Sequence, residues 1–585
     1  MIRSLSLIAG ACLALAGVSS GAPLQEGVPI QLLRGGSFGT TAPGDATGPA
    51  WWRWNPDGAT WSLEERDGVT WLVLEPGAEV SQSLPWPPGV EPNSIVLGGR
   101  AEGAAQIAWE GSGGAGFTGA VVGAFQFAGA ELTGAATNPR FTLTLSAPAD
   151  AAEPARFAEL SATGALPSVA AEDLRAEIVA ELARYFELAL AHGTDDFGQR
   201  GTPFVVRDFD LASGDALGAP FNRVTLHPLY SEMLEAWRWE PRPEWEAALA
   251  AFLEVFLDEG VHPDTGLPRF WDPLADEARN LDPLEIRAHL NFLLDVAEFG
   301  PEATRGRALA AAERMAERVL ERGLLPDGNV AAQYVPSTGE ARTGTPPIRR
   351  LDVPAALARL GRMTERDELR DAARDAVLEM EYAHWWPGTW DGIDPGFDDD
   401  YGHYGQRAAQ MLEAWPDVPA FERLSVEGLV HYLPLWRDAV RFGGNVAADQ
   451  VRCWEIATRL ARLRPELRAE VAGRLDEALH LHLLGEQTPD GRWIDVTVVD
   501  FRPQHLPVGD TAGAPQNLLY GLALALHPRV LGDRSYRDPA EARAWFAALW
   551  RAEGRLGVGQ PGSFFERLRL LPGTVEALVG LSQAP

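Results

Sequence analysis

A short polar stretch ahead of a predicted helix holds the side chains best suited to acid–base chemistry. Residues 397–407 read FDDDYGHYGQR, with three carboxylates followed by phenol, imidazole and guanidinium groups. Negative charge is favoured at a helix start, so the carboxylates at 398–400 have an explanation as caps. His403 and Arg407 are four residues apart and share a helical face. Capping leaves four residues unexplained, and these are the first candidates for catalysis: Tyr401, His403, Tyr404 and Arg407.

Polar side chains also gather at the starts of other helix-like segments. Buried polar groups are costly without a purpose, so their concentration predicts a lined cavity. The competing interpretation is that Arg and Asp form structural salt bridges between neighbouring helices. Two further catalytic candidates are His227 and Asn222, and the candidates for substrate binding are Arg223, Tyr230, Arg287, His289, Asn291, Arg350, Asp400, Arg452, Trp386, Trp390 and Asn517. The two tryptophans lie in a long connection, where their rings could stack on sugars or serve as plugs.

The elements that must position these residues are paired helices. About fourteen segments with apolar residues at helical spacing follow residue 168. The second member of several pairs, such as 302–322, has a charged face suited to an outer layer. First members, such as 283–298, are more apolar and suit an inner layer. We expect the pairs to close into a ring, with the long connections opening on one face beside the starts of the inner helices: 193–222, 260–282, 324–350, 387–401 and 485–513.

Residues 23–165 are expected to form a separate, strand-rich domain. Short apolar runs at 70–74, 94–97 and 141–145 are punctuated by Gly and Pro, which is typical of a β-sandwich. The sequences GGSF at 35–38 and PAWW at 49–52 resemble the opening of galactose-binding-like jelly-roll modules, which implies glycan binding on exposed aromatics. The candidates for such a platform are Trp51, Trp52, Trp54 and Trp61. We favour the alternative that these rings are core residues, because buried aromatics outnumber ligand platforms.

Residues 166–585 resemble the (α/α) toroid superfamily of carbohydrate-active enzymes. The resemblance rests on the hairpin rhythm and on YGHYG at 401–405, which is similar to segments of toroidal polysaccharide lyases. It implies that a Tyr and a His exchange the protons of β-elimination, while Arg and Asn neutralise a uronate carboxylate. Abstracting the proton next to a carboxylate requires that neutralisation and a base of suitable proton affinity. The expected fold class is multidomain α and β, an N-terminal β-sandwich followed by an (α/α)6–7 helical toroid.

These patterns leave three functions open. The first is a secreted polysaccharide lyase that cleaves an acidic, uronate-containing glycan. The second is an inverting glycoside hydrolase on the same ring, which would use two carboxylates separated by room for a water. Its candidates are Asp399 or Asp400 with Glu232, Glu285 or Asp449. The third is a non-catalytic glycan-binding or surface scaffold protein. An all-helical toroid of the prenyl-cyclase kind is a competing scaffold.

Charge narrows the range of partners. The 585 residues include 82 acidic and 50 basic side chains, a formal net charge of −32. So negative a field disfavours nucleic acid and anionic membranes, and it counts mildly against an anionic substrate. The expected partner is therefore a polysaccharide or oligosaccharide, with no nucleic acid. We expect no cofactor and no metal: His480 and His482 cannot share a helical face, and the loop aspartates lack a calcium spacing.

The first 22 residues predict a secretory signal. Arg3 precedes a short apolar run, and the small residues Ser20, Gly21 and Ala22 offer a cleavage site. The protein is therefore expected to be secreted or periplasmic, with lipid anchoring at Cys12 as a minor alternative. No later apolar run is long enough to span a bilayer.

Overall fold

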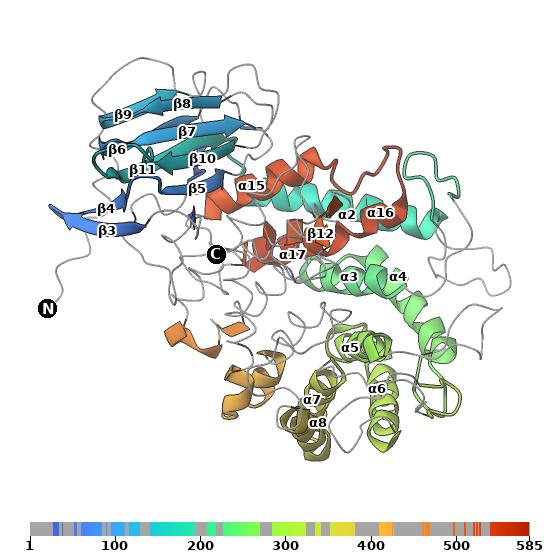
Figure 1. The fold of residues 1–585 in the computed structure, drawn as a ribbon. Coiled ribbons are helices and arrows are strands. Elements are labelled where there is room, and N and C mark those ends of the chain that lie inside the picture. The colour runs from blue at the N-terminus through green and yellow to red at the C-terminus, as the bar shows by residue number, and fades with distance from the viewer. Residues whose placement is uncertain are drawn as a thin grey trace, which may run out of the picture.

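The chain folds into a strand-rich N-terminal part and a larger helical part (Figure 1). The computed structural model describes residues 27–33, 38, 52–54, 60–84, 89–90, 95–111, 116–128, 141–192, 208–217, 226–268, 283–322, 334–340, 352–380, 409–423, 425, 459–460, 463–467, 495–497, 508–510, 519–520, 522–523, 526–527 and 539–583. Within this part of the chain, no helix is long and apolar enough to cross a membrane.

Two antiparallel sheets make up the strand-rich part. The first has the order β3-β4-β11-β6-β9, and β1 pairs with the end of β11. Its strands are β1 (Val28–Gln31), β3 (Trp61–Arg66), β4 (Val69–Leu74), β6 (Val96–Gly103), β9 (Gly123–Ala128) and β11 (Ala155–Leu166). The second sheet has the order β2-β5-β10-β7-β8. Its strands are β2 (Arg53–Trp54), β5 (Glu79–Leu84), β7 (Gln106–Gly111), β8 (Gly116–Ala120) and β10 (Phe141–Ser146).

Alternating apolar residues give each sheet a buried face. In β10, Leu143 and Leu145 are fully buried, while Thr142 and Thr144, which alternate with them, are not. This is the period of two that a half-buried strand requires. Trp52 and Trp109 are also fully buried, and the ring of Trp52 lies 5.8 Å from that of Phe38. Trp52 is therefore a core residue, as the favoured interpretation predicted, and the inward-facing side chains of both sheets belong to one hydrophobic core.

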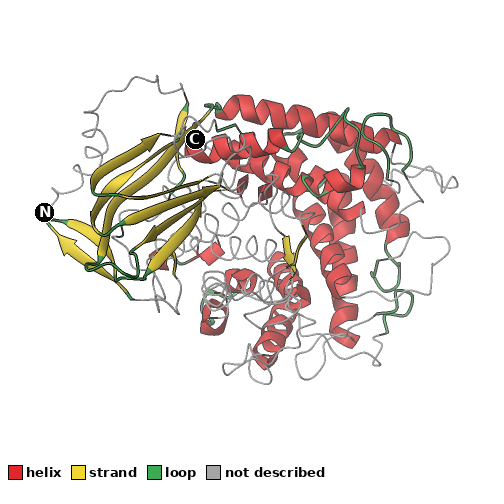
Figure 2. Ribbon diagram, turned by 45° about the horizontal axis from the view of Figure 1, so that its top comes forward, coloured by secondary structure: helices red, strands yellow, loops and turns green. Residues whose placement is uncertain are grey.

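The helical part consists largely of antiparallel helix pairs (Figure 2). In chain order the helices are α2 (Ala171–His192), α3 (Leu226–Trp239), α4 (Pro243–Val255) with its π-helical extension η3 (Phe256–Gly260), α5 (Pro283–Phe299), α6 (Glu302–Arg322), α7 (Asp352–Thr364), α8 (Asp367–Met380), α15 (Pro539–Ala552), α16 (Phe564–Leu568) and α17 (Leu571–Gln583). A 3-10 turn, η7 (Pro465–Leu467), and a two-stranded ribbon of β12 (Asp495–Thr497) and β13 (Val508–Asp510) complete the described elements. Short links join α3 to α4, α5 to α6 and α7 to α8.

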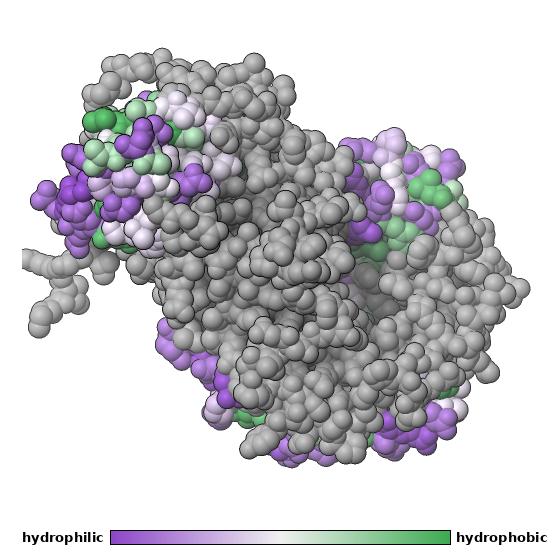
Figure 3. Space-filling view, viewed as in Figure 1, coloured by the Kyte–Doolittle hydropathy of each residue, from purple (hydrophilic) through white to green (hydrophobic). Residues whose placement is uncertain are grey.

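The pair α5 and α6 differs as the sequence predicted, with α5 the more apolar helix, whereas in the pair α3 and α4 the second helix is the more apolar. Contacts run from α17 to α3, from α3 to α5 and from α5 to α7, so these first members lie side by side. The outer helix α6 covers the predicted range 302–322. It buries Ala308, Ala312 and Met315, whereas Arg307 on its other side forms ion pairs with Glu254 and Asp258. On the face shown in Figure 3, the described surface of β3 and β4 and of the lower helices is mainly hydrophilic.

Three turns of the same geometry follow the outer helices α2, α4–η3 and α6. They span residues 210–214, 262–266 and 335–339, and each ends in a glycine with φ of 77°, 70° and 68° respectively. In each turn the glycine N–H donates to the carbonyl four residues earlier, at 2.8 Å. A side chain would be strained at such a φ, which explains the glycines. Thr265 links two of the turns, because its hydroxyl donates to the Pro336 carbonyl at 2.7 Å.

The last helix brings the two ends of the helical part together. α17 contacts both α3 and α2, so the end of the helical part meets its beginning. Gly573 and Gly580 permit close packing on the segment at 519–527: a Cβ on Gly573 would lie 2.9 Å from the Tyr520 nitrogen. A Cβ on Gly580 would lie 2.9 Å from the Leu526 Cβ. Nearby, α15 packs on β1 and β11 and thereby joins the helical part to the strands.

Candidate active site

One stripe of α5 carries two polar residues that the sequence singled out, Arg287 and Asn291, and a third that it did not, Asp295. Arg287, Asn291 and Asp295 are spaced by four, which places them on one side of the helix. Asn291 and Asp295 line a cavity. The predicted shared face of Arg287 and Asn291 is therefore consistent with the described helix. His289 lies on the other side of α5, where its ring centroid is 6.2 Å from that of Phe256 in η3.

On α3, the predicted Tyr230 occupies a core position. It is fully buried, and its ring stacks on Phe252 of α4 with centroids 3.7 Å apart and planes at 6°. Burial raises the pKa of the Tyr230 phenol, so this group keeps its proton. The ring is directed at the outer helix α4. Glu232 is two residues further along, or about 200° around the helix, and therefore faces the opposite side, toward the interior of the ring.

Four carboxylates approach one another on neighbouring inner helices. Glu232 and Glu235 come from α3, Asp295 from α5 and Glu576 from α17. Burial, followed by the negative charges of Glu576, Glu235 and Asp295, raises the pKa of Glu232 well above its usual range. Burial also raises the pKa of Glu235, although the Trp239 indole donates to it at 2.7 Å. Like charges held in a poorly hydrated place favour the protonated form, so Glu232 can act as a proton donor.

An arginine ion pair and a histidine contact flank this group of acids. Arg359 of α7 donates to Asp295 at 2.6 Å and to Glu298 at 3.1 Å. Even so, burial outweighs the guanidinium and leaves the pKa of Asp295 raised. On α17, Glu576 lies 3.1 Å from the Nε2 of His527. At Arg359 the structure thus shows a salt bridge between helix pairs, which was the competing interpretation for polar residues on inner helices.

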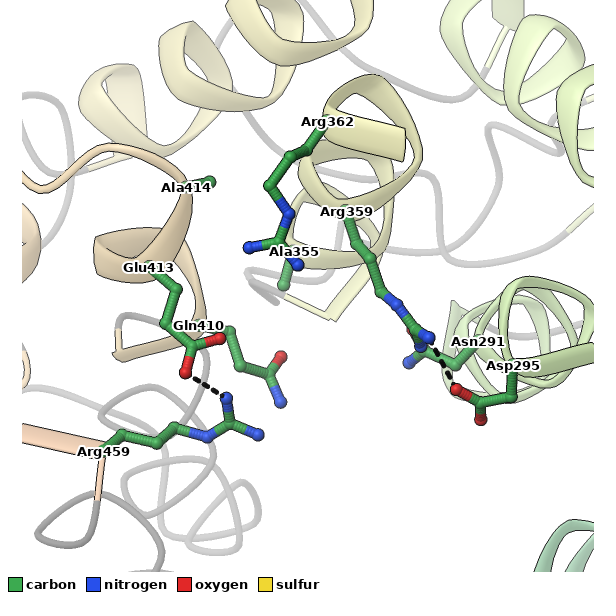
Figure 4. A pocket seen from close by; sticks show the side chains of 9 residues that line it. All are labelled: Asn291, Asp295, Ala355, Arg359, Arg362, Gln410, Glu413, Ala414 and Arg459. Atoms are coloured by element: carbon green, nitrogen blue, oxygen red, sulfur yellow. Dashed lines mark hydrogen bonds and ion pairs between the residues drawn. The ribbon is translucent and has the colours of Figure 1, made fainter. Parts of the chain in front are cut away.

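A cavity of about 330 Å³ continues the same inner surface (Figure 4). Its walls come from α5, α7, the helical turns at 409–414 and the helix near residue 459. In Figure 4 the Arg359–Asp295 pair lies on one side and the Arg459–Glu413 pair, at 2.9 Å, on the other. The lining residues are Asn291, Asp295, Ala355, Arg359, Arg362, Gln410, Glu413, Ala414 and Arg459.

Most of the predicted site lies outside the described residues. Of His227 the structure describes only the backbone, as part of α3, and of Glu285 only the backbone in α5. The sequence predictions that fall outside the described residues are Asn222, Arg223, Arg350, Trp386, Trp390, Asp399, Asp400, Tyr401, His403, Tyr404, Arg407, Asp449, Arg452 and Asn517. Their roles stay predictions.

Several residues of the inner surface were missed by the sequence analysis, which gave most weight to helix starts. They lie in the middle and last turns of the inner helices: Glu235, Asp295, Arg359, Arg362, Gln410, Glu413, Arg459 and Glu576. Spacing carried a signal for some of them. Ala355, Arg359 and Arg362 follow one another at intervals of four and three residues, so they lie on one face of α7. The small Ala355 on that face leaves space for a cavity. Among the described residues, no group of three or more His, Cys, Asp or Glu side chains could hold a metal ion.

Known proteins resemble this chain at the level of structure. No protein-family model and no curated protein sequence matches it. An α-1,2-mannosidase from Trichoderma reesei aligns with 70% of this chain and 93% of its own at 11% identity and a TM-score of 0.45. A cellobiose 2-epimerase from Bacillus thermoamylovorans aligns with 69% and 98% at 12% identity and a TM-score of 0.41. An unsaturated glucuronyl hydrolase specific for heparin aligns with 65% and 98% at 12% identity and a TM-score of 0.35.

These three neighbours are carbohydrate-active enzymes that carry out different reactions, as their names state. Similarity at this level does not choose among hydrolysis, epimerisation and elimination.

Proposed function

We propose that the protein is a carbohydrate-active enzyme that hydrolyses glycosidic bonds within its ring of helices. The observation that carries this proposal is Glu232, an inner-helix carboxyl group whose pKa is raised by burial and by Glu235, Asp295 and Glu576. A carboxylic acid that keeps its proton near neutral pH is what a glycosidase needs to protonate the leaving oxygen.

The proposed reaction divides the work between two carboxyl groups. Glu232 donates its proton to the glycosidic oxygen as the bond to the anomeric carbon breaks. A second, ionised carboxylate takes a proton from water, and the water oxygen attacks the anomeric carbon from the opposite face. Asp399 and Asp400 are the sequence-based candidates for that base. An ionised base and a protonated acid require different surroundings, and the carboxylates around Glu232 supply the surroundings of the acid.

A polysaccharide lyase acting on an acidic glycan is the second candidate function. Its described support is the shared face of Arg287 and Asn291 on α5, because elimination needs cationic and amide groups around a uronate carboxylate. In that reaction Tyr404 and His403 would exchange the protons. The remaining parts of the proposal are a secretion signal at 1–22, a jelly-roll β-sandwich at 23–165 and a ring of six or seven hairpins at 166–585.

Product analysis with two variants separates these functions. The protein is incubated with a panel of neutral and uronate-containing glycans, and both new reducing ends and ultraviolet absorbance from unsaturated ends are measured. Hydrolysis predicts reducing ends without absorbance, and the variant Glu232→Gln should lose roughly 10²–10⁴-fold in turnover, the usual contribution of a general acid. Glu246→Gln makes the same substitution on the exposed side of α4 and should leave turnover unchanged.

The opposite results have clear meanings. Unsaturated products that disappear in Tyr404→Phe but persist in Glu232→Gln would replace the hydrolase with the lyase. Retention on a glycan column without any product would leave the non-catalytic binding protein. Full hydrolytic turnover in Glu232→Gln would remove Glu232 as the acid.

A further inference from the structure

The lining of the cavity between α5, α7 and the turns at 409–414 contains more arginines than carboxylates. Its lining includes three arginines, Arg359, Arg362 and Arg459, and two carboxylates, Asp295 and Glu413. One positive charge is therefore in excess at this place, in a protein whose formal net charge is −32. A local cluster of this kind is what a negatively charged ligand needs in order to overcome the repulsion of the whole molecule.

Arg362 supplies the excess charge. Arg359 is paired with Asp295 and Glu298, and Arg459 is paired with Glu413. Arg362 forms no ion pair with any other described residue, and Figure 4 shows its guanidinium directed into the space between the two pairs. A planar guanidinium matches the oxygens of a carboxylate or phosphate and binds them through two parallel hydrogen bonds.

The remaining walls suit a small oxyanion-bearing ligand. The amides of Asn291 and Gln410 each bring two N–H donors to the cavity. Ala355 and Ala414 are small, so they leave room beside Arg362. The volume of about 330 Å³ lies at the lower end of the range for ligand pockets. The cavity therefore offers a charged anchor, neutral donors and space for a ligand of limited size.

The cavity lies beyond the predicted substrate-binding residue Arg287 along α5 and beside the proposed acid Glu232. Asp295, which lines the cavity and contributes to the raised pKa of Glu232, comes eight residues after Arg287. At the helical rise, this separation corresponds to about two turns, or roughly 12 Å. Arg362 lies in the last turn of α7, next to the short link to α8 rather than the long connection before α7.

The geometry points to an anion-binding site in this cavity, beside the proposed acid Glu232, in which Arg362, Asn291 and Gln410 hold the oxyanion of a small ligand. The shared chemistry is a carboxylate or phosphate group, supplied either by a sugar acid or by free phosphate. The inference rests on the charges and shape of the cavity and does not depend on the reaction proposed above.

Calorimetric titration of the full chain at low salt tests this inference. The probes are glucuronate, inorganic phosphate and, as the neutral counterpart, glucose. At least one of the two anions should bind saturably while glucose does not. Binding of glucuronate would identify a sugar acid as the ligand, and binding of inorganic phosphate would identify free phosphate. Arg362→Gln should weaken that binding at least about tenfold, the effect of losing about 1.4 kcal/mol of a charged hydrogen bond. Arg362→Lys keeps the positive charge but lacks the planar guanidinium, so its affinity for the anion should lie between those of Arg362→Gln and the unaltered protein.

Two control variants make the result specific to the cavity. Arg322→Gln removes an equally charged side chain from the outer helix α6, where it lies 3.9 Å from Glu340, and should leave the affinity unchanged. Ala355→Leu fills the cavity while keeping Arg362, and it should abolish binding. Equal affinity in Arg362→Gln and the unaltered protein, undiminished binding in Ala355→Leu, or no saturable binding of either anion would each overturn the inference.

Discussion

Replacing Glu232 with glutamine is expected to stabilise the protein at neutral pH while leaving its stability in acid unchanged. The folded-state pKa of Glu232 is raised by burial and by three neighbouring carboxylates. In the unfolded chain the group returns to its ordinary value of about 4.3. Between these two pKa values the folded chain binds more protons than the unfolded chain, so the free energy of unfolding falls as pH rises.

The size of the effect follows from proton linkage. Below about pH 4, Glu232 is protonated in both states, and glutamine is a neutral substitute of similar shape. Above that pH, the unaltered protein loses about 1.4 kcal/mol per pH unit relative to Glu232→Gln, until the folded-state pKa is reached. The gap between the two proteins is then constant. Because Glu235 and Asp295 repel the same charge, the variant should also ease their ionisation.

Urea unfolding measured from about pH 4 to about pH 8 provides the assay. The free-energy difference between Glu232→Gln and the unaltered protein should be near zero at the acid end and should grow with pH. Glu246→Gln, on the exposed side of α4, controls for the removal of a carboxylate elsewhere. If the free-energy difference between the two proteins stays the same across this pH range, the surroundings of Glu232 do not raise its pKa. The proposal that Glu232 is the acid would then lose its support.

Two further substitutions test the packing and the ion pairs around the inner helices. Gly573→Ala should destabilise the protein by about 1–3 kcal/mol, because its Cβ would meet backbone atoms at 2.9–3.2 Å. Gly306→Ala should instead stabilise it by about 0.5–1 kcal/mol, because nothing lies within 4 Å of its Cβ inside α6. Equal unfolding midpoints for the two variants would contradict this account. Arg359→Leu should cost about 2 kcal/mol in a urea titration, between the values for exposed and buried pairs, because it strands Asp295 without its cation. Adding Asp295→Asn should recover most of that loss, and a double variant no more stable than Arg359→Leu would refute the coupling.

Long elements with a strong period were predicted well from the sequence. The outer helix expected at 302–322 is α6 over Glu302–Arg322. Its alanine-rich face and its charged face give a clear amphipathic helical pattern. The strand expected at 70–74 is β4 over Val69–Leu74. Helix and strand periods of this kind are local properties, so a single chain reveals them.

Predictions failed where a local pattern was weak. The run at 94–97 overlaps only the start of β6, which extends over Val96–Gly103. Gly98, Gly99 and Gly103 hide the rest of that strand, because glycine has little β propensity of its own. Close packing explains two of these positions: a Cβ on Gly99 would lie 2.4 Å from Leu160, and one on Gly103 would lie 2.1 Å from the Pro154 carbonyl oxygen.

The site was harder to predict than the fold. Glu232, Asp295 and Glu576 lie on three helices far apart in the sequence, and burial together with their proximity in space raises the pKa of Glu232. Nothing local to any one of them signals that encounter. Tyr230 is the converse case. Its position on α3 predicted a site residue, yet its ring stacks on Phe252 of the outer helix α4. The sequence therefore indicated that the inner helices carry polar residues, but it identified only some of those residues.

The contact of α17 with both α2 and α3 has a consequence for the order of folding during synthesis. α17 (Leu571–Gln583) is synthesised well after α2 and α3, which are much earlier in the chain. Until α17 docks, the apolar residues of α2 and α3 that it covers remain exposed to other chains. These two helices are therefore expected to need protection by a chaperone until α17 is in place.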